Sequence, residues 1–347
     1  MGSIFYNFND CLDNLDSYEK TININVGLRP SGKLHIGNFA TLLLSFMLSD
    51  TINSNGKDSM LRLTICDLDL PYLEEDGSPD NCIINYRDMP DEEGCHDSFS
   101  LHVSDNVEKT VRLVQGCGLN FNYEINFFSE LQKELGYRVG LKKLLDKNMD
   151  VKMIYNGDRP RKSKSDKTLV YPLCPECRTS SKSSSRYDSE RGVLSMECLN
   201  AMCDVDSFEF DVYDTEYDIA VHFFLNAIRD IMIEPFADVH VLGGDYASIH
   251  GGNRIRGVEK VKSLMELMGA GTPDYLVGPL LMGNNGQKMG KSIGNGLNFF
   301  ELIEDQGDDI IYKMIDFTRE NIINNTEYPK NDSLKINYEQ IKSILKI

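Results

Sequence analysis

The sequence has no apolar run long enough to cross a membrane, and it begins without the charged-then-apolar pattern of a secretory signal. A membrane-spanning helix needs about 20 consecutive apolar residues, and a signal peptide needs a basic start followed by an apolar stretch. We therefore expect a cytoplasmic protein with no membrane partner. A glycine follows Met1, but this alone is weak support for myristoylation.

Basic residues are also scarce: 36 Lys and Arg stand against 54 Asp and Glu, which gives a net charge of −18. A surface of that charge repels nucleic-acid phosphates at long range. The balance argues against a DNA partner, and any RNA contact requires a local basic patch. Such a segment runs from Lys152 to Arg191, with ten basic and five acidic residues.

Short strand-like runs alternate with helical patterns along the chain. Residues 21–27, TININVG, form a β-branched run that ends in glycine, and residues 61–70 form a similar apolar run. This alternation predicts an α/β fold with a Rossmann-like parallel sheet, which binds nucleotides at the carboxyl ends of its strands. We expect the first half of this catalytic domain in residues 1–150, a basic insertion in 151–210, the second half in 211–300 and a short helical segment in 301–347.

The first candidate site follows the strand of residues 21–27 and has the sequence GLRPSGKLHIGN, from Gly27 to Asn38. Gly27 lets a substrate lie against the backbone, and Gly37 leaves room for a flat adenine ring. His35 and Asn38 present neutral donors to phosphate oxygens at the start of a helix, whose N-terminus attracts anions. The alternative is a Pro-Gly turn followed by a helix-capping histidine.

The second candidate site is a glycine-flanked loop, GQKMGKSIGN, at residues 286–295. Lys288 and Lys291 can neutralise the charge that develops as pyrophosphate leaves ATP. Gly290 and Gly294 allow the loop to close over a ligand. The alternative is a solvated basic loop without a ligand.

The two motifs together resemble the HIGH and KMSKS signatures of class I aminoacyl-tRNA synthetases, because HIGN precedes KMGKS by about 250 residues. The sequence is most similar to the archaeal-type class I lysyl-tRNA synthetases. That similarity spans roughly residues 20–300 and includes GLRPSGKLHIGNF, the strand end Cys66-Asp67-Leu68-Asp69, PDEEGCHDSF, EPFADVHVLGG, two cysteine pairs and the KMGKS loop.

The resemblance implies that ATP, with its Mg²⁺, and an amino acid bind between the two motifs. It implies that His35, Asn38, Lys288 and Lys291 stabilise the transition state of adenylate formation. The other candidate ATP- and amino-acid-binding residues are Gly27, Arg29, Ser31, Gly37, Thr41, Asp67, Asp69, His96, His240, Gly243, Gly244, Asp245, Met289 and Ser292.

The sequence departs from the family pattern in three places. Gly290 replaces the first serine of KMSKS, which removes a hydroxyl donor. Thr41 stands where the lysyl enzymes carry a glutamate, and a buried ammonium without a carboxylate is costly, so lysine is in doubt as the substrate. About 50 residues follow the KMGKS loop, fewer than the helical anticodon-binding region needs, so we expect that domain to be lacking.

Four of the nine cysteines have metal-ligand spacing. Cys174 and Cys177 form a C-x2-C pair, and Cys198 and Cys203 form a C-x4-C pair 20 residues later. Such pairs predict a four-cysteine structural zinc ribbon, and the alternative is four unrelated core cysteines. The remaining cysteines, Cys11, Cys66, Cys82, Cys95 and Cys117, lack this spacing and are expected to be buried thiols.

The basic insertion leaves two alternatives open. It either holds the acceptor end of a tRNA near the adenylate or is a solvated loop without a partner. His96, in the segment GCHDSF, is likewise either a site residue, as the resemblance implies, or a histidine with a structural role.

The expected reaction is ATP-dependent formation of an aminoacyl-adenylate, in the manner of a class I lysine–tRNA ligase, followed by transfer to tRNA. One alternative is a synthetase paralogue that activates another amino acid and loads a non-tRNA acceptor. Another is a catalytically silent binding or regulatory protein, although the retained HIGN motif and lysines argue against it.

Overall fold

The computed structural model describes residues 2–31, 34–71, 82–91, 94–156, 168–181, 185–247, 257–269, 271–284, 286–289, 297–325, 332 and 334–345. Its centre is a six-stranded sheet in which every neighbouring pair of strands is parallel. The strands are, in spatial order, β1 (Ile4–Phe5), β11 (Asp274–Val277), β10 (Val239–Leu242), β2 (Ile22–Leu28), β3 (Ser59–Ile65) and β4 (Asn122–Phe127).

The strand order contains a reversal between β2 and β10. From β2 the chain proceeds to β3 and β4 on one side, whereas β10 and β11 are added on the other side. Val26 of β2 pairs with both Leu63 of β3 and Val241 of β10, so these three strands end close together. In open parallel sheets, ligands bind at such a reversal, outside the carboxyl ends of the strands.

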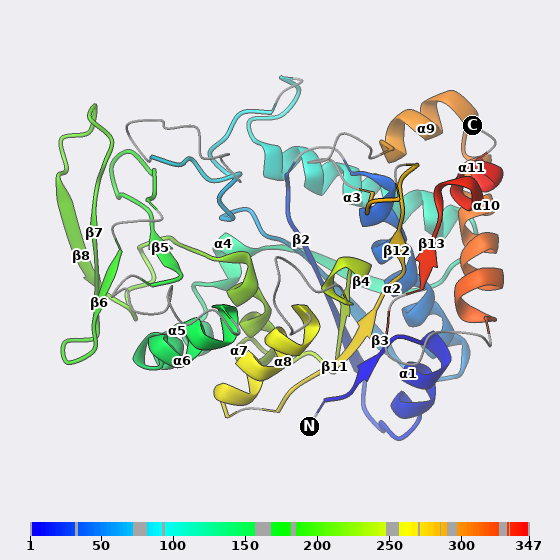
Figure 1. The fold of residues 1–347 in the computed structure, drawn as a ribbon, viewed down its shortest axis with the longest axis horizontal. Helices are drawn as coiled ribbons and strands as arrows, with labels where there is room; N and C mark the ends of the chain where they lie inside the picture. Colours follow the sequence, from blue (N-terminus) through cyan, green and yellow to red (C-terminus); the bar gives the residue numbers. More distant parts are fainter. Residues whose placement is uncertain are drawn as a thin grey trace.

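Helices cover both faces of the sheet (Figure 1). One apolar cluster joins Val26 and Val241 to the helices of one layer, and the other joins Leu242 and Val277 to those of the opposite layer. The first layer holds α1 (Phe8–Leu15), α2 (Ile36–Ser54), α3 (Phe99–Gly116), α9 (Phe299–Gln306), α10 (Asp309–Thr318), η5 (Arg319–Ile323) and α11 (Tyr338–Leu345). The second holds α4 (Phe128–Leu131), α5 (Leu135–Asp146), α6 (Asn148–Asn156), η2 (Phe223–Ile228), α7 (Arg229–Met232) and α8 (Gly257–Leu267).

Short antiparallel strands form a separate unit, at the far end of the molecule from α9–α11 in Figure 1. Strands β6 (Arg186–Asp188), β7 (Val193–Glu197) and β8 (Ser207–Asp211) make one sheet, and β5 (Val170–Pro172) pairs with β9 (Ile219–Val221). A short turn, η3 (Gly244–Ala247), follows β10, and β12 (Leu280–Leu281) pairs with β13 (Lys335–Ile336).

The predicted α/β class with a parallel sheet is confirmed, and two boundaries differ from expectation. The strand expected over residues 61–70 is β3, which ends at Ile65, and the carboxylates that follow lie in a turn. The helical pattern of residues 130–147 predicts one helix there, but the structure has two, α4 and α5, because the chain turns around Gln132. No described helix combines the length and the hydropathy that a membrane span requires.

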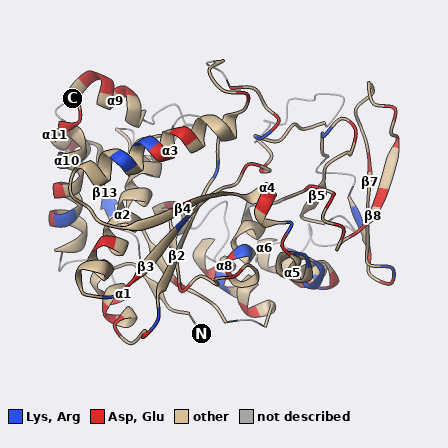
Figure 2. Cartoon of the chain, turned by 180° about the vertical axis from the view of Figure 1, so that it is seen from behind, with Lys and Arg blue, Asp and Glu red and all other residues tan. Residues whose placement is uncertain are grey.

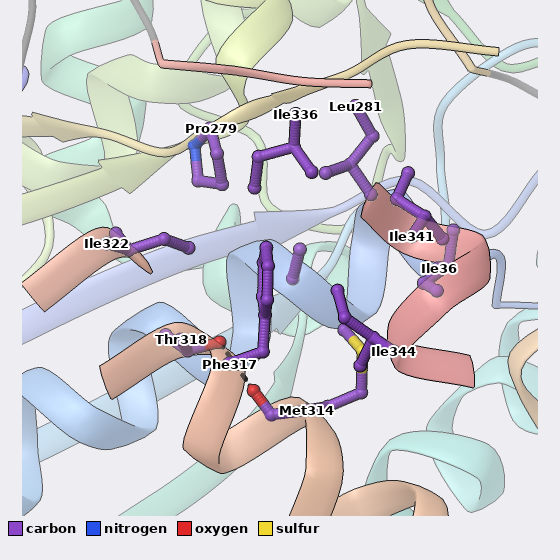
Figure 3. Close-up of a pocket in the computed structure, with 11 residues that line it drawn as sticks. Ile36, Pro279, Leu281, Met314, Phe317, Thr318, Ile322, Ile336, Ile341 and Ile344 are labelled. Atoms are coloured by element: carbon purple, nitrogen blue, oxygen red, sulfur yellow. Dashed lines mark hydrogen bonds between the residues drawn. The ribbon is translucent and has the colours of Figure 1, made fainter. Parts of the chain in front are cut away.

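An apolar cavity lies beneath the C-terminal helices (Figure 3). It is lined by side chains of α2, α10 and α11, among them Ile36, Met314 and Ile341. Its volume is about 10 Å³, enough for no more than about one water molecule. This cavity is therefore a packing defect of the first helical layer and not a nucleotide site.

Candidate functional site

The HIGN motif lies at the expected place after β2, with His35 preceding α2 and Ile36, Gly37 and Asn38 in its first turn. His35 is the N-cap residue of α2, and its Nδ1 accepts a hydrogen bond of 3.0 Å from the backbone N–H of Gly37. The helix-capping role considered as the alternative is therefore present. The first turn of α2 contains no acidic residue, so the positive potential of the helix N-terminus remains available to an anion.

The backbone after the KMGKS loop pairs directly with the HIGN motif. The N–H of Ile36 donates to Leu297 at 2.9 Å, and the N–H of Phe299 donates to Leu34 at 3.0 Å. The rings of Phe39 and Phe299 stack with their centroids 3.8 Å apart. The HIGN motif and residues 297–299, which follow the KMGKS loop in the sequence, thus meet at the start of α2.

Lys288, the first lysine of KMGKS, lies beside the turn that follows β10. Its Nζ is 3.6 Å from Asp245 Oδ2, and both side chains are partly exposed. Met289 is buried, and its N–H donates to Leu281 at 2.7 Å, which fixes the start of the loop. The predicted residues Lys291 and Ser292, with Gly290, lie outside the described residues.

The Gly243-Gly244-Asp245 turn packs against both α2 and the strand that precedes the loop. A Cβ on Gly244 would lie 2.3 Å from the carbonyl oxygen of Pro279, and one on Gly243 would lie 3.6 Å from Thr41 Oγ1. Thr41 itself donates to the carbonyl oxygen of Gly37 at 3.2 Å. Glycine at positions 243 and 244 therefore lets this turn approach α2 and the backbone of Pro279 closely. Predicted site residues from α2, from this turn and from the start of the KMGKS loop lie near one another.

The carboxylates Asp67 and Asp69 are buried in the turn after β3. Asp67 Oδ1 accepts from the N–H of Ser129 at 2.9 Å, and burial raises the pKa of this carboxyl. Asp69 accepts from Asn226 Nδ2 at 2.6 Å and lies 3.6 Å from Arg29 Nε. Burial raises the pKa of Asp69 to about 6, against the opposing effect of Arg29.

Arg29 and Ser31, two further predicted residues, lie in the turn that leaves β2. Arg29 reaches across to the turn after β3, where its guanidinium also donates to the carbonyl oxygen of Leu70. Ser31 is exposed and its N–H donates to the carbonyl oxygen of Arg29 at 2.9 Å. Arg29 therefore ties the ends of β2 and β3 together, whereas Ser31 lies on the surface.

Sequence reasoning missed a buried ionic group beside His240, composed of Asn25, Arg229 and Asp230. Asp230 accepts a hydrogen bond of 2.9 Å from Asn25 Nδ2 and contacts His240 Nδ1. Burial alone raises the pKa of Asp230, but His240 and Arg229 reverse this effect and lower it to about 2. The signal in the sequence was a charged pair, Arg229-Asp230, inside the apolar run FFLNAIRDIMI.

The four cysteines of the predicted zinc ribbon come together. Their sulfur atoms lie within 4.8 Å of one another, with Cys174 and Cys203 at 3.7 Å and Cys177 and Cys198 at 3.6 Å. Arg178, which follows the first pair, has a φ of 58° and closes a tight turn back to Cys174. Four cysteine thiolates in this arrangement match a structural zinc site.

His96 belongs to a second group that can hold a metal ion, with Asp91, Cys95 and His102. Cys95 Sγ lies 3.0 Å from Asp91 Oδ2 and 3.2 Å from His96 Nδ1, and His102 Nδ1 lies 3.2 Å from the same Asp91 oxygen. Carboxylate, thiolate and imidazole are all zinc ligands. Cys95 was expected to be a buried thiol, but it is exposed. The sequence did not indicate this cluster, because its carboxylate, thiol and imidazole donors follow no common metal-binding spacing.

A metal ion held by this second cluster would support the segment that contacts the carboxylate turn. In that segment, residues 82–91, the N–H of Arg87 donates to the backbone carbonyl oxygen of Asp67 at 2.8 Å and the N–H of Tyr86 donates to that of Asp69 at 3.3 Å. Asp91 ends the segment, and a metal ion bound between Asp91 and His102 would fix it to α3. The expected role of such an ion is therefore structural support of the site.

Comparison with known proteins agrees with this geometry. The family model described as tRNA synthetases class I (K) matches residues 10–217. The chain belongs to this family. The matched region includes the HIGN motif, both carboxylates and both candidate metal clusters.

Two curated relatives are archaeal lysine–tRNA ligases. The one from Thermococcus kodakarensis is 25% identical over 168 residues, which cover 44% of this chain and 30% of the relative. The one from Haloarcula marismortui is 24% identical over 198 residues, or 52% of this chain and 35% of the relative. The matches thus span about a third of the length of these two relatives.

Among solved structures, the chain is similar to a tyrosyl-tRNA synthetase of Archaeoglobus fulgidus complexed with L-tyrosine. The TM-score is 0.41 at 16% identity, and the alignment covers 91% of this chain and 76% of that one. It is also similar to the Mycobacterium tuberculosis methionyl-tRNA synthetase in complex with methionyl-adenylate, with a TM-score of 0.45, 12% identity and coverage of 93% and 68%.

Proposed function

We propose that this chain activates an amino acid with ATP, forming an aminoacyl-adenylate, and transfers the aminoacyl group to tRNA. The observation that supports this best is the direct pairing of the HIGN segment with the backbone that follows the KMGKS loop. In the reaction, the amino-acid carboxylate attacks the α-phosphorus of ATP, and pyrophosphate leaves. Such chemistry depends on positioning and charge stabilisation more than on acid–base groups.

The proposed roles rest on the family resemblance and on the positions of the described residues among them. The N-terminus of α2, with His35 and Asn38, faces the phosphates, and Lys288 and Lys291 stabilise the departing pyrophosphate. Mg²⁺ arrives with ATP, which is its usual mode of binding in such sites. The amino acid and the ribose lie over the ends of β2 and β10. The residues proposed to contact them are Gly27, Thr41, Asp67, Asp69, His240, Gly243, Gly244 and Asp245.

Two metal ions have structural roles in this proposal. Zinc held by Cys174, Cys177, Cys198 and Cys203 fastens the antiparallel unit, and an ion held by the second cluster fastens Asp91 and Cys95 to the start of α3. Both donor sets fit zinc. Neither ion is assigned a part in adenylate formation.

The identity of the amino acid and the binding of the tRNA acceptor rest on separate observations. The relatives are lysine–tRNA ligases, whereas Thr41 supplies no carboxylate for a lysine ammonium. A tRNA must approach an acidic molecule, and Figure 2 shows acidic residues in red on α9 and residues of both charges along α3. The basic insertion is the proposed contact for the acceptor end, and most of its basic core, residues 159–167, lies outside the described residues.

A matched pair of lysine variants tests the proposal. Lys288→Ala is expected to lower the rate of ATP–pyrophosphate exchange by about 100- to 1000-fold, because a preorganised charge on the transition state is lost. Lys142→Ala removes a lysine that pairs with Asp146 on the far helix α5 and should leave exchange unchanged. Equal rates for the wild-type chain and Lys288→Ala would contradict the proposal.

A further inference from the structure

One face of the central strand β2 is polar from end to end. Asn25, Gly27 and Arg29 alternate along the strand with the buried Val26 and Leu28, so the three share a face. Gly27 is exposed even though β3 and β10 flank β2 on both sides. Solvent therefore reaches the sheet over Gly27, beside the reversal in strand order where ligands bind.

The guanidinium group of Arg229 lies directly over Gly27. A Cβ on Gly27 would lie 2.7 Å from Arg229 Nη2 and 3.3 Å from Cζ. Only glycine at this position leaves the guanidinium in place. Arg229 is 2% exposed, so a buried cation borders the exposed position at Gly27.

Arg229 is incompletely hydrogen-bonded within the described part of the chain. Its Nη1 donates to the carbonyl oxygen of Asn226 at 2.9 Å, and its Nε lies 3.4 Å from Asp230 Oδ1. Nε and Nη2 have no hydrogen-bond partner there. Buried donors of a charged group without an acceptor cost free energy, and a bound anion would supply the acceptor.

The carboxylates nearest Arg229 are engaged mainly with other residues and leave its Nη2 without an acceptor. Asp230 accepts from Asn25 and contacts His240, and Asp69 accepts from Asn226 and lies near Arg29. A ligand on the exposed side of Gly27 would supply an acceptor for Nη2.

We infer that Arg229 binds the carboxylate of the amino-acid substrate over Gly27; this inference rests on the proposed function. A guanidinium binds a planar carboxylate through two parallel N–H donors. A phosphate of ATP is the poorer match, because α2, whose N-terminus is the proposed phosphate site, packs in the opposite helical layer from α7. The carboxylate is either the α-carboxylate of any amino acid or the side-chain carboxylate of aspartate or glutamate.

Steady-state ATP–pyrophosphate exchange tests this inference with two variants and one control. Arg229→Lys keeps the charge but loses the two-donor geometry, and Gly27→Ala displaces the guanidinium. Each is expected to raise the KM for the amino acid by about 10-fold or more while the KM for ATP stays within about twofold. Arg62→Lys, at a buried arginine paired with Glu124 on the far side of β3, should change neither constant.

The outcomes separate the inference from the proposed function. Suppose that the wild-type chain catalyses exchange. If the KM for the amino acid is then unchanged in both variants, or if it rises no more than the KM for ATP, the role of Arg229 is overturned and adenylate formation still stands. Absence of exchange with all 20 amino acids would overturn both. Exchange limited to aspartate or glutamate would assign the bond to the side-chain carboxylate, and exchange with any other amino acid would assign it to the α-carboxylate.

Discussion

Replacing Asp230 by asparagine is expected to destabilise the protein strongly. The substitution keeps the shape of the side chain but removes the counter-charge of Arg229, and both residues are buried, with exposures of 0% and 2%. Removing one partner of a buried ion pair costs about 3–5 kcal/mol. The lowering of the Asp230 pKa from 3.8 to about 2 corresponds to roughly 2–3 kcal/mol in favour of the ionised form, which supports the lower end of that range.

Urea unfolding at pH 7, followed by circular dichroism, measures this effect as a change in the free energy of unfolding. Asp146→Asn is the matched control, because the Lys142–Asp146 pair is partly exposed and should contribute less than about 1 kcal/mol. Since the pKa of Asp230 is lowered in the folded state, its contribution is present above about pH 4 and is lost as the pH falls towards 2. A cost below about 1 kcal/mol for Asp230→Asn would refute the buried network.

Three further predictions concern the metals, Asp69 and a glycine. Elemental analysis should find two metal ions per chain, and Cys95→Ser and Cys177→Ser should each remove one of them; a single ion that survives Cys95→Ser would contradict the second site. Because the pKa of Asp69 is raised to about 6, its contribution to stability is present below about pH 4 and is lost as the pH rises through 6. Asp69→Asn should therefore make the free energy of unfolding less dependent on pH between about 4 and 6. An unaltered pH dependence in that range would contradict the raised pKa. Gly244→Ala brings a Cβ within 2.3 Å of a backbone oxygen and should lower both stability and exchange, whereas Gly116→Ala, with open space around it, should change stability by no more than about 1 kcal/mol.

The sequence allowed the parallel sheet and the two ends of the site to be predicted. Strand β2 has a β-branched run that ends in glycine, and the helix that follows begins at the expected histidine. The two motifs were expected to act together, and the segment that follows the KMGKS loop pairs with HIGN through Leu297 and Ile36. These features are local or follow from the rule that parallel strands end at one edge of a sheet. The domain boundaries and the roles of individual site residues stay predictions.

The features that were missed depend on contacts between distant residues. Arg229 and Asp230 lie in a short apolar segment whose pattern gave no sign that it packs against Gly27 and Asn25 of β2. The second metal cluster draws on a carboxylate, a thiol and two imidazoles whose spacing follows no common metal motif. In both cases the fold, not the local pattern, brings the chemical groups together.

The most direct test of the account is ATP–pyrophosphate exchange by the purified chain with each of the 20 amino acids, with and without total tRNA. The account predicts exchange that depends on one amino acid and is lost in Lys288→Ala. Exchange with lysine would show that a carboxylate other than one at Thr41 receives the ammonium group, and exchange with another amino acid would show a changed specificity. No exchange under any of these conditions would contradict adenylate formation by this chain.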